Sequence, residues 1–463
     1  MNLNTEFTWE KAQQTVKNLI LRQRHKCLSD IETIILKGAW DNLTYEDIAE
    51  AEGYASSYLS KDVGNRLWAN LSLALGEKVS KKNFKTALYK EWSKQAQNNL
   101  TGHLAELSKF SAAENITFPE GSVALNSPFY IERRLRGESQ SQLESVCYQT
   151  VVKPGSLIRI KGAKWMGKTS LVNRILQHGS ISGQKIVYLD FNSVERSILQ
   201  DLDKLLRWLC VMVSRQLSVK SKVKEYWDTD ILGSNDNCTV YFEEYILPET
   251  TGAIALALDN IDRLFTYEVV IEDLFGMLRS WHEKGKTDKV WAQLRLILAH
   301  STEVYIPLDI NQSPFNAGMP VLLEEFEAIQ VQQLAFLYHL NWNEHQIEQL
   351  MDLVGGHPYL VRLAMYRIKS TKITLEQFLD RAVLEMEIYS DPLRRLLNTL
   401  RCSPSLTSAY AKVVQSSEPI FLDSLQLYQL HSIGLVRHQQ NLVHPRCKLY
   451  RNYFNLTLNA SLN

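Results

Sequence analysis

The sequence predicts an α/β core with a parallel sheet, flanked by an N-terminal all-α domain and by C-terminal helical and winged-helix domains. Four short apolar runs alternate with helical stretches in the middle of the chain, over 157–161, 185–191, 253–258 and 294–299. Such runs are typical of strands buried on both faces of a parallel sheet. Helical periodicity prevails on either side, and near the C-terminus a helix trio precedes two short strands around a polar turn.

Length and composition limit the alternatives. With 463 residues the chain is too long for one hydrophobic core. We expect a helix-turn-helix domain (1–100), a linker (101–128), the core (129–325), a helical lid (326–388) and a winged helix (389–463). Basic and acidic residues number 51 each, which favours neither nucleic acid nor an anionic membrane. Scattered cysteines and the lack of a long apolar run predict a cytoplasmic protein without membrane association.

The N-terminal domain carries the pattern of a helix-turn-helix. Thr44 is a natural N-cap, with Asp47 three residues later in a variant capping box. Gly53 ends this short helix, and Ser56 or Ser57 is expected to cap the next one. Apolar residues recur every fourth position along that second helix. A short helix, a glycine turn and an amphipathic helix together predict the motif.

Two interpretations of this domain remain open. In the first it binds DNA, and the groove is contacted by Ser57, Ser60, Lys61, Asn65 and Arg66. In the second it is a helical surface for other proteins. The second helix is only mildly basic and includes Asp62, whereas affinity for DNA depends mainly on neutralising phosphates.

A phosphate-binding loop follows the first predicted strand. The segment Gly162-Ala163-Lys164-Trp165-Met166-Gly167-Lys168-Thr169-Ser170 fits the pattern G-x-x-x-x-G-K-[ST], with a strand before it and a helix after it. Backbone amides of such a loop surround phosphate oxygens, and the helix N-terminus adds partial positive charge. Lys168 is expected to bridge the β- and γ-phosphates, and the Thr169 hydroxyl to ligate Mg²⁺. The core is therefore predicted to be a P-loop NTPase that binds a purine nucleoside triphosphate.

An acidic residue ends another predicted core strand. Asp259 follows the run 253–258, where it would hold Mg²⁺ directly or through water. Asp262 is either a second acid of the site or a cap of the following helix. Many hydrolysing P-loop ATPases have a glutamate directly after the strand-ending aspartate, but here the residue is Asn260. An amide can position water but cannot accept its proton, so we expect slow hydrolysis or none.

A third strand end could sense the γ-phosphate. The run 294–299 is followed by His300, Ser301 and Thr302. One of these polar groups could contact the phosphate, or all three could be ordinary loop residues, and the sequence favours neither. Arginines acting from a neighbouring subunit cannot be assigned, since Arg263, Arg279 and Arg295 fit structural roles equally well.

From about residue 127 to 454 the chain resembles the AAA-like ATPases found largely in cyanobacteria, relatives of the STAND group of signal-transduction NTPases. The matching segments are 127–130, 166–171, 258–265, 300–316, 355–360 and 445–451. The resemblance implies that ATP or ADP binds with Mg²⁺, that Pro358 packs near the adenine, and that His444 or Arg446 reaches a phosphate from a locking winged helix. Family members usually have glutamate at position 260. Residues 44–59 resemble the helix-turn-helix of vWA-MoxR-associated proteins.

These implications favour a STAND-type switch in signalling or defence. ADP would hold the chain closed, while ATP would free the N-terminal module and drive homo-oligomerisation, with an effector or regulator protein supplying the output. One alternative is a transcription regulator that binds DNA under nucleotide control. Another is an active AAA-type remodelling ATPase, against which Asn260 argues.

Overall fold

The computed structural model describes residues 8–24, 28–92, 94, 116–134, 142–301, 317–384, 389–440 and 442–459. The chain divides into two compact units, Met1–Ser111 and Ala112–Asn463. None of the described helices is long and apolar enough to cross a membrane.

The N-terminal unit is all-helical, as predicted. It contains α1 (Trp9–Arg24), α2 (Asp30–Trp40), α3 (Tyr45–Glu52), a π-helical stretch (Tyr58–Gly64) that continues into α4 (Asn65–Leu75), and a helix over 84–92. Its core is formed by apolar side chains at helical spacing, including the fully buried Leu59, Leu67 and Leu71. The every-fourth-residue pattern therefore identified the buried face of the second helix.

The capping predictions in this unit were partly right. Thr44 and Asp47 form the expected reciprocal capping box, and Gly53 ends α3 in the left-handed region with φ 71°. The expected cap at Ser56 or Ser57 is wrong. Ser57 already has helical angles and makes no side-chain capping bond. The amides of Tyr58 and Leu59 bond instead to the carbonyl of Ala55, so the helix begins earlier than predicted.

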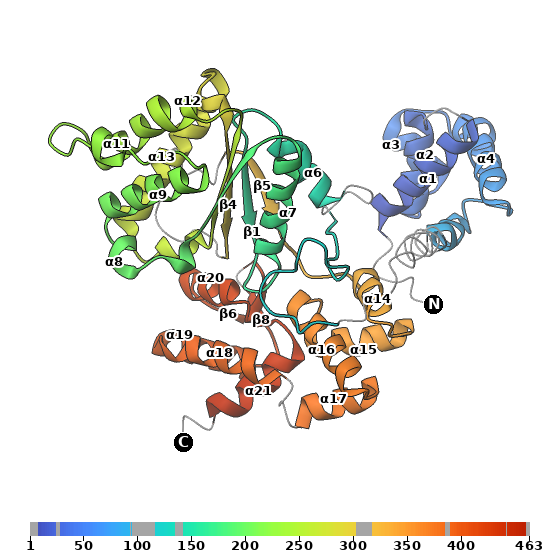
Figure 1. Cartoon of the computed structure of the whole chain (residues 1–463). Coiled ribbons are helices and arrows are strands. Elements are labelled where there is room, and N and C mark those ends of the chain that lie inside the picture. Colours follow the sequence, from blue (N-terminus) through green and yellow to red (C-terminus); the bar gives the residue numbers. More distant parts are fainter. Residues whose placement is uncertain are drawn as a thin grey trace. The chain divides into compact units, whose positions relative to one another are not determined.

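The core of the second unit is a five-stranded parallel sheet (Figure 1). Its order is β2-β3-β4-β1-β5, with bounds Lys185–Asp190, Ile254–Asp259, Leu294–His300, Leu157–Lys161 and Met319–Leu322. Every residue of β3 and β4 is buried, which explains their continuous apolar sequences. Four strands match the predicted runs to within a residue or so. The fifth, β5, was missed because it is a short edge strand interrupted by Pro320.

Helices cover both faces of this sheet (Figure 1). On one face, α6 (Leu143–Val151) and α7 (Lys168–Ile181) pack against strand residues such as Ile160, Ala257 and Ala299. On the other face, α9 (Leu202–Gln216) and α13 (Glu268–Thr287) pack against the alternate strand residues, such as Leu256 and Leu298. Alternation along each strand thus supplies both apolar layers.

The segment between β2 and β3 is more elaborate than predicted. The single helix expected over 197–217 is two helices, α8 (Arg196–Leu199) and α9, because Asp201 caps a new helix by accepting a bond from the Lys204 amide. Further helical pieces follow: α10 (Val223–Tyr226), α11 (Ser234–Tyr241), a π-helical stretch (Phe242–Ile246) and α12 (Leu247–Glu249).

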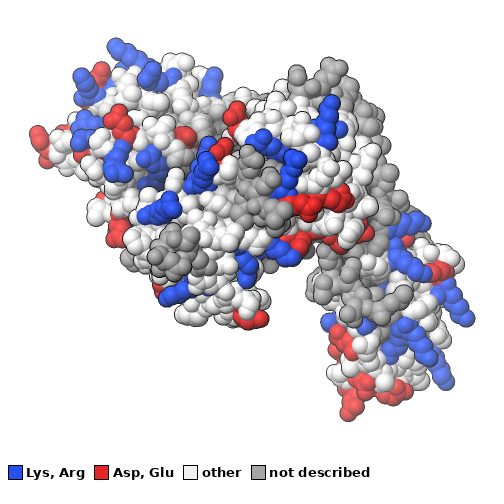
Figure 2. Space-filling model, turned by 90° about the horizontal axis from the view of Figure 1, so that it is seen from below, with Lys and Arg blue, Asp and Glu red and all other residues white. Residues whose placement is uncertain are grey.

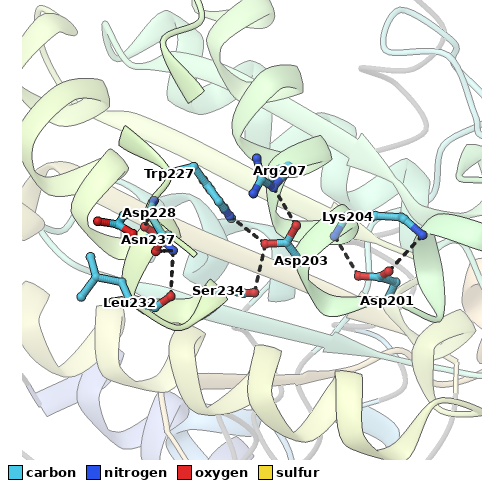
Figure 3. A network of polar contacts seen from close by, with 9 residues as sticks. All are labelled: Asp201, Asp203, Lys204, Arg207, Trp227, Asp228, Leu232, Ser234 and Asn237. Carbon is cyan, nitrogen blue, oxygen red and sulfur yellow. Dashed lines mark hydrogen bonds and ion pairs between the residues drawn. The ribbon is translucent and has the colours of Figure 1, made fainter. Parts of the chain in front are cut away.

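A polar network holds this segment together (Figure 3). The Asp203 carboxylate accepts bonds from Trp227 Nε1 at 2.7 Å, Arg207 Nε at 2.7 Å and Ser234 Oγ at 3.2 Å. One carboxylate therefore joins α9 to the loop before α11 and to α11 itself.

The C-terminal part of the unit is helical with one small sheet. Its elements are α14 (Ala328–Leu337), α15 (Glu344–Val354), α16 (Pro358–Thr371), α17 (Leu375–Leu384), α18 (Ser390–Arg401), α19 (Pro404–Gln415), β6 (Ile420–Phe421), α20 (Ser424–Ile433), β7 (Val436–Gln439), β8 (Leu442–Pro445) and α21 (Lys448–Asn459). The sheet is antiparallel, in the order β6-β8-β7. The helix trio and the two predicted strands are therefore present, while the winged-helix assignment stays a prediction. All these helices share one apolar core, which also includes Phe129 and Ile131.

We predict that Asp203→Ala lowers the free energy of unfolding by about 1–3 kcal/mol, since three donors lose their acceptor. Urea denaturation followed by tryptophan fluorescence measures the change. Glu225→Ala, an exposed carboxylate of the same segment, is the control and should change stability by less than about 0.5 kcal/mol. Equal effects of the two substitutions would show that the network adds nothing.

Candidate phosphate-binding site

The loop between β1 and α7 has a backbone shaped by two residues with positive φ. Gly167 has φ 98° and Trp165 has φ 64°. The Arg133 guanidinium supports the loop from behind, because it donates to the Met166 carbonyl at 3.1 Å and lies 4.1 Å from the ring centre of Phe326. Arg133 is buried, so this support is a fixed part of the loop.

Lys168 begins α7 and is almost completely buried. Its ammonium donates to the carbonyls of Gly162 at 2.9 Å and Ala163 at 3.1 Å. Burial lowers the pKa of Lys168, while the nearby charges of Asp262 and Asp259 oppose this shift. The predicted phosphate-binding lysine therefore lies inside the curve of its own loop.

Asp259, at the end of β3, is the fully buried acid of the site. Its Oδ2 accepts from Thr169 Oγ1 at 2.6 Å and from the Tyr188 hydroxyl at 2.9 Å, and its Oδ1 accepts from the Asn260 amide at 2.8 Å. Burial raises the pKa of Asp259, and the bonds from Thr169 and Tyr188 oppose the rise. The two residues predicted to hold a metal thus touch each other.

These oxygens fit Mg²⁺ in kind. Mg²⁺ prefers hard oxygen ligands and usually takes only one or two from the protein, the others coming from phosphates and water. Thr169 and Asp259 offer such a pair. No cluster of three or more acidic, histidine or cysteine side chains that could enclose a metal by itself occurs in the described part of the chain.

Asn260 occupies a left-handed backbone conformation, with φ 57°. Its side-chain Nδ2 donates to Asp190 Oδ1 at 2.8 Å, across the ends of β3 and β2. Asp262 bonds elsewhere. Its carboxylate accepts hydrogen bonds from the Ser301 backbone amide at 3.0 Å and from the Ser301 hydroxyl at 2.5 Å. These bonds tie the turn after β3 to the end of β4.

His300 is the last residue of β4 and is only 3% exposed. It lies in register with Lys161, the last residue of β1 before the phosphate loop. Thr302, named with it, lies outside the described residues. The three arginines that could not be assigned have local partners. Arg263 donates to carbonyls of 191–194 and Arg295 to the Ala292 carbonyl, while Arg279 pairs with Glu283 at 3.0 Å.

Pro358 is the first residue of α16, and its neighbours lie beside the loop. The Tyr359 ring packs on the Trp165 ring with centroids 5.2 Å apart. The preceding turn requires glycine, because a Cβ on Gly356 would lie 2.0 Å from the Phe326 carbonyl oxygen. His357 is buried in this turn, where burial and the charge of Arg446 lower its pKa to about 3.

The C-terminal sheet region also reaches the loop. The Lys164 amide donates to the Ser432 carbonyl, at the end of α20, at 3.1 Å. The N-terminal side of the core contributes as well: Val123 donates to Ser170 Oγ at 2.9 Å, and Arg174 in α7 bonds to the Val123 carbonyl. Residues 116–128, predicted as the end of a linker, therefore pack on the helix that follows the loop.

The Glu325 carboxylate accepts hydrogen bonds from three residues that are distant from it in sequence. We call the four residues, Glu325, Gly356, Arg437 and Arg446, the Glu325 cluster. Glu325 accepts from Arg446 Nη1 at 2.8 Å, from the Arg437 guanidinium and from the Gly356 amide at 3.2 Å. Burial opposes ionisation of Glu325, but the two arginines outweigh it and lower its pKa. Arg446, expected at a phosphate, is 5% exposed and engaged by Glu325. His444 Nδ1 lies 3.0 Å from the Pro445 carbonyl oxygen.

The residues predicted to contact DNA lie in the N-terminal unit, on the helix over 56–75. Ser60 Oγ donates to the Ser56 carbonyl and Asn65 Nδ2 to the Lys61 carbonyl, so both side chains bond to their own helix. Ser57, Lys61 and Arg66 are exposed.

Sequence reasoning missed four residues around the loop: Arg133, Tyr188, Asp190 and Glu325. Two of them had a detectable signal. Tyr188 and Asp190 stand two residues apart at the end of a predicted strand, so strand alternation alone would have placed both side chains on one face near its carboxyl edge. Arg133 and Glu325 had none, because their partners are distant in sequence.

Comparison with known proteins adds two family matches. The profile of the AAA-like domain matches residues 118–456, and that of the vWA-MoxR associated protein N-terminal HTH matches residues 7–91. No protein with a curated function matches the sequence.

Solved structures show distant similarity. A Walker-type ATPase of Pyrococcus abyssi has a TM-score of 0.48 at 13% identity, with 67% of this chain and 94% of that chain covered. The ORC2 protein of Aeropyrum pernix, in ADPNP–ADP complexes, has a TM-score of 0.41 at 16% identity, with 72% and 96% covered. Cdc6p from Pyrobaculum aerophilum has a TM-score of 0.38 at 13% identity, with 73% and 97% covered.

We predict that Glu325→Gln destabilises the second unit by about 3 kcal/mol, because the buried Arg446 loses its counter-charge. Urea denaturation measures the loss. Because the folded-state pKa of Glu325 is lowered, its stabilisation is present above about pH 4.3 and is lost as the pH falls through that pKa.

The matched control is Asp352→Asn. Asp352 pairs with Lys448 at 2.6 Å, and both side chains are more than 60% exposed, so this substitution should cost less than about 1 kcal/mol. A loss as large as that of Glu325→Gln would contradict the distinction between the two pairs.

Proposed function

The chain belongs to the family of proteins with the AAA-like domain, and from this premise we propose that it is a nucleotide-binding switch of STAND type, in signalling or defence. ATP or ADP binds at residues 162–170, with Pro358 beside the base and Mg²⁺ held by Thr169 and Asp259. The observation that carries the proposal is the hydrogen bond from the Lys164 amide to Ser432. A C-terminal segment there occupies a backbone donor of the phosphate loop.

The loop can exchange its internal bonds for phosphate contacts. Among the described residues the Lys168 ammonium donates to two neutral carbonyls, and a phosphate offers it a charged acceptor, which makes a stronger bond. Thr169 and Asp259 bond to each other, and Mg²⁺ would replace that hydrogen bond with two ligand contacts. Bound Mg²⁺ would supply charge neutralisation at the phosphates.

The Glu325 cluster provides the closed state of the switch. It joins the strand end near the loop, the turn before α16 and the sheet β6-β8-β7 through one carboxylate. In the ADP form this cluster would hold the C-terminal part against the loop. ATP would release it, free the N-terminal module and allow homo-oligomerisation, and a separate effector or regulator protein would supply the output.

Hydrolysis in this switch would be slow or absent. Asn260, which follows Asp259, cannot take a proton from water, and its side-chain amide donates to Asp190. An active remodelling ATPase remains the alternative that rapid turnover would favour.

We predict that Lys168→Ala weakens ATP binding about 10- to 100-fold, the value of one charge-assisted hydrogen bond. Isothermal titration with Mg-ATP and Mg-ADP measures the affinity. Lys153→Ala, an exposed lysine in the turn before β1, should leave the affinity unchanged. If the unmodified protein neither carries nor takes up nucleotide, the proposal fails.

A DNA-binding regulator is the second candidate, favoured by the charge distribution of the N-terminal unit. Residues 77–94 contain six lysines and two glutamates, a net charge of +4, while 43–57 contain four acids and no lysine or arginine. Figure 2 shows basic and acidic side chains gathered on different parts of this unit, the lobe at the right. Lys81 and Lys85 lie over the rings of Tyr45 and Trp40. If the unit binds DNA, this lysine-rich segment adds phosphate contacts to those of Lys61 and Arg66.

We predict that replacing Lys78, Lys82 and Lys94 by alanine makes DNA affinity less sensitive to salt. The slope of log K against log salt concentration should become shallower by about 2–3, because each lost phosphate contact contributes about 0.9. Fluorescence anisotropy with a duplex measures the slope. The double substitution Lys61→Ala with Arg66→Ala tests the predicted recognition helix in parallel. Failure of the unmodified protein to bind the duplex at low salt would remove this candidate.

A further inference from the structure

The edge of the sheet beside the phosphate loop carries three carboxylates, and they differ in how their oxygens are used. Asp259 uses both oxygens, one for the Asn260 amide and one for Thr169 and Tyr188. Asp262 also uses both, for the amide and the hydroxyl of Ser301. Asp190 uses only Oδ1, which accepts from the Asn192 amide and the Asn260 side chain, each at 2.8 Å. Among the described residues its Oδ2 has no hydrogen-bond donor.

Asp190 also lies on the same side of the sheet as Thr169 and Asp259. It ends β2 in register with Asp259, the end of β3. Residues two apart on a strand point to the same face, and Tyr188, two residues earlier, already contacts Asp259. The side chain of Asp190 therefore leaves β2 on the face that bears Thr169 and Asp259. It lies two residues nearer the carboxyl end of β2 than Tyr188.

Asn260 connects the two strand ends. Its left-handed backbone lets Nδ2 reach Asp190 across the ends of β3 and β2. The amide group has a second functional atom, Oδ1, which is a hydrogen-bond acceptor only. The pair thus holds an amide just after β3 and a carboxylate at the end of β2, and no donor among the described residues occupies Asn260 Oδ1 or Asp190 Oδ2, which leaves both for a shared water molecule.

We propose that Asp190 is the catalytic proton acceptor for the slow hydrolysis of ATP, and that Asn260 positions the attacking water. This inference rests on the proposed binding of ATP at the phosphate loop. Position 260, directly after Asp259, carries an amide in this chain, and Asp190 at the end of the neighbouring strand β2 supplies the carboxylate instead. Hydrolysis is then slow because the base is displaced by one strand, and it is not abolished.

The reaction balances without any further reactant. The oxygen of water forms a bond to the γ-phosphorus, and the bond from that phosphorus to the β–γ bridging oxygen breaks, with its electron pair leaving on ADP. The water proton passes to Asp190 Oδ2 and from there to the released phosphate or to solvent. The products are ADP and inorganic phosphate.

A carboxylate–amide exchange tests the proposal in the full-length protein. Four forms are compared: unmodified, Asp190→Asn, Asn260→Glu, and the double substitution that exchanges the two groups between the strands. Phosphate release is measured in single turnovers with protein in excess over Mg-ATP, and ATP affinity is measured separately by titration. Asp201→Asn, a helix cap in the same segment, is the control and should change neither quantity.

The expected result is a rate at least about 100-fold lower for Asp190→Asn at unchanged ATP affinity, within the range for loss of a general base. Asn260→Glu alone should give no gain, because it places two carboxylates against each other. The exchanged pair should recover the unmodified rate or exceed it, because it again offers a carboxylate and an amide to the attacking water. Unchanged ATP affinity in Asp190→Asn separates loss of the proton acceptor from a general disturbance of the site.

Three results would overturn the proposal: no measurable hydrolysis by an ATP-loaded unmodified protein, an unchanged rate for Asp190→Asn, or no recovery in the exchanged pair. Loss of ATP binding in the unmodified protein is a different result, because it defeats the proposed nucleotide site itself. The separate affinity measurement distinguishes the two failures.

Discussion

Burial of one carboxylate governs the arrangement of the site. Asp259 is wholly removed from solvent, and an ionised group in such a position is tolerated only when it is fully hydrogen-bonded. Its three donors come from α7, from β2 and from the turn after β3. Satisfying Asp259 therefore fixes the start of the helix after the phosphate loop relative to two strands. The parallel register, which aligns Asp190 with Asp259, brings the remaining polar groups to the same edge.

The phosphate loop is confined by segments far from it in sequence. Arg133 holds it from the N-terminal side, Tyr359 packs on Trp165, and Ser432 bonds to its backbone. The last of these contacts depends on a C-terminal region that Glu325 ties to the rest of the unit through Arg446. The loop geometry is therefore sensitive to a sheet that lies about 270 residues later in the chain.

Local patterns predicted most of the fold and the centre of the site. The loop 162–170 and Asp259 follow apolar strands directly, so their positions could be deduced from short stretches. β5 was missed because an edge strand containing Pro320 lacks a long apolar run. The helices of 223–249 were missed because they are short and are held in place by Asp203 and other tertiary contacts. The Glu325 cluster pairs residues 112 and 121 positions apart, for which a single sequence contains no signal.

The shared core of the C-terminal part has a consequence for synthesis on the ribosome. The Phe129 ring packs against the Tyr338 ring with centroids 4.4 Å apart, and Gln330 bonds to the Glu132 carbonyl, 198 residues earlier. At a translation rate of about 5–20 residues per second, the early segment waits roughly 10–40 s for its partners to be made. During that interval the nascent chain carries the apolar side chains of Phe129 and Ile131 uncovered, so the last elements to leave the ribosome complete a core whose first residues were made long before.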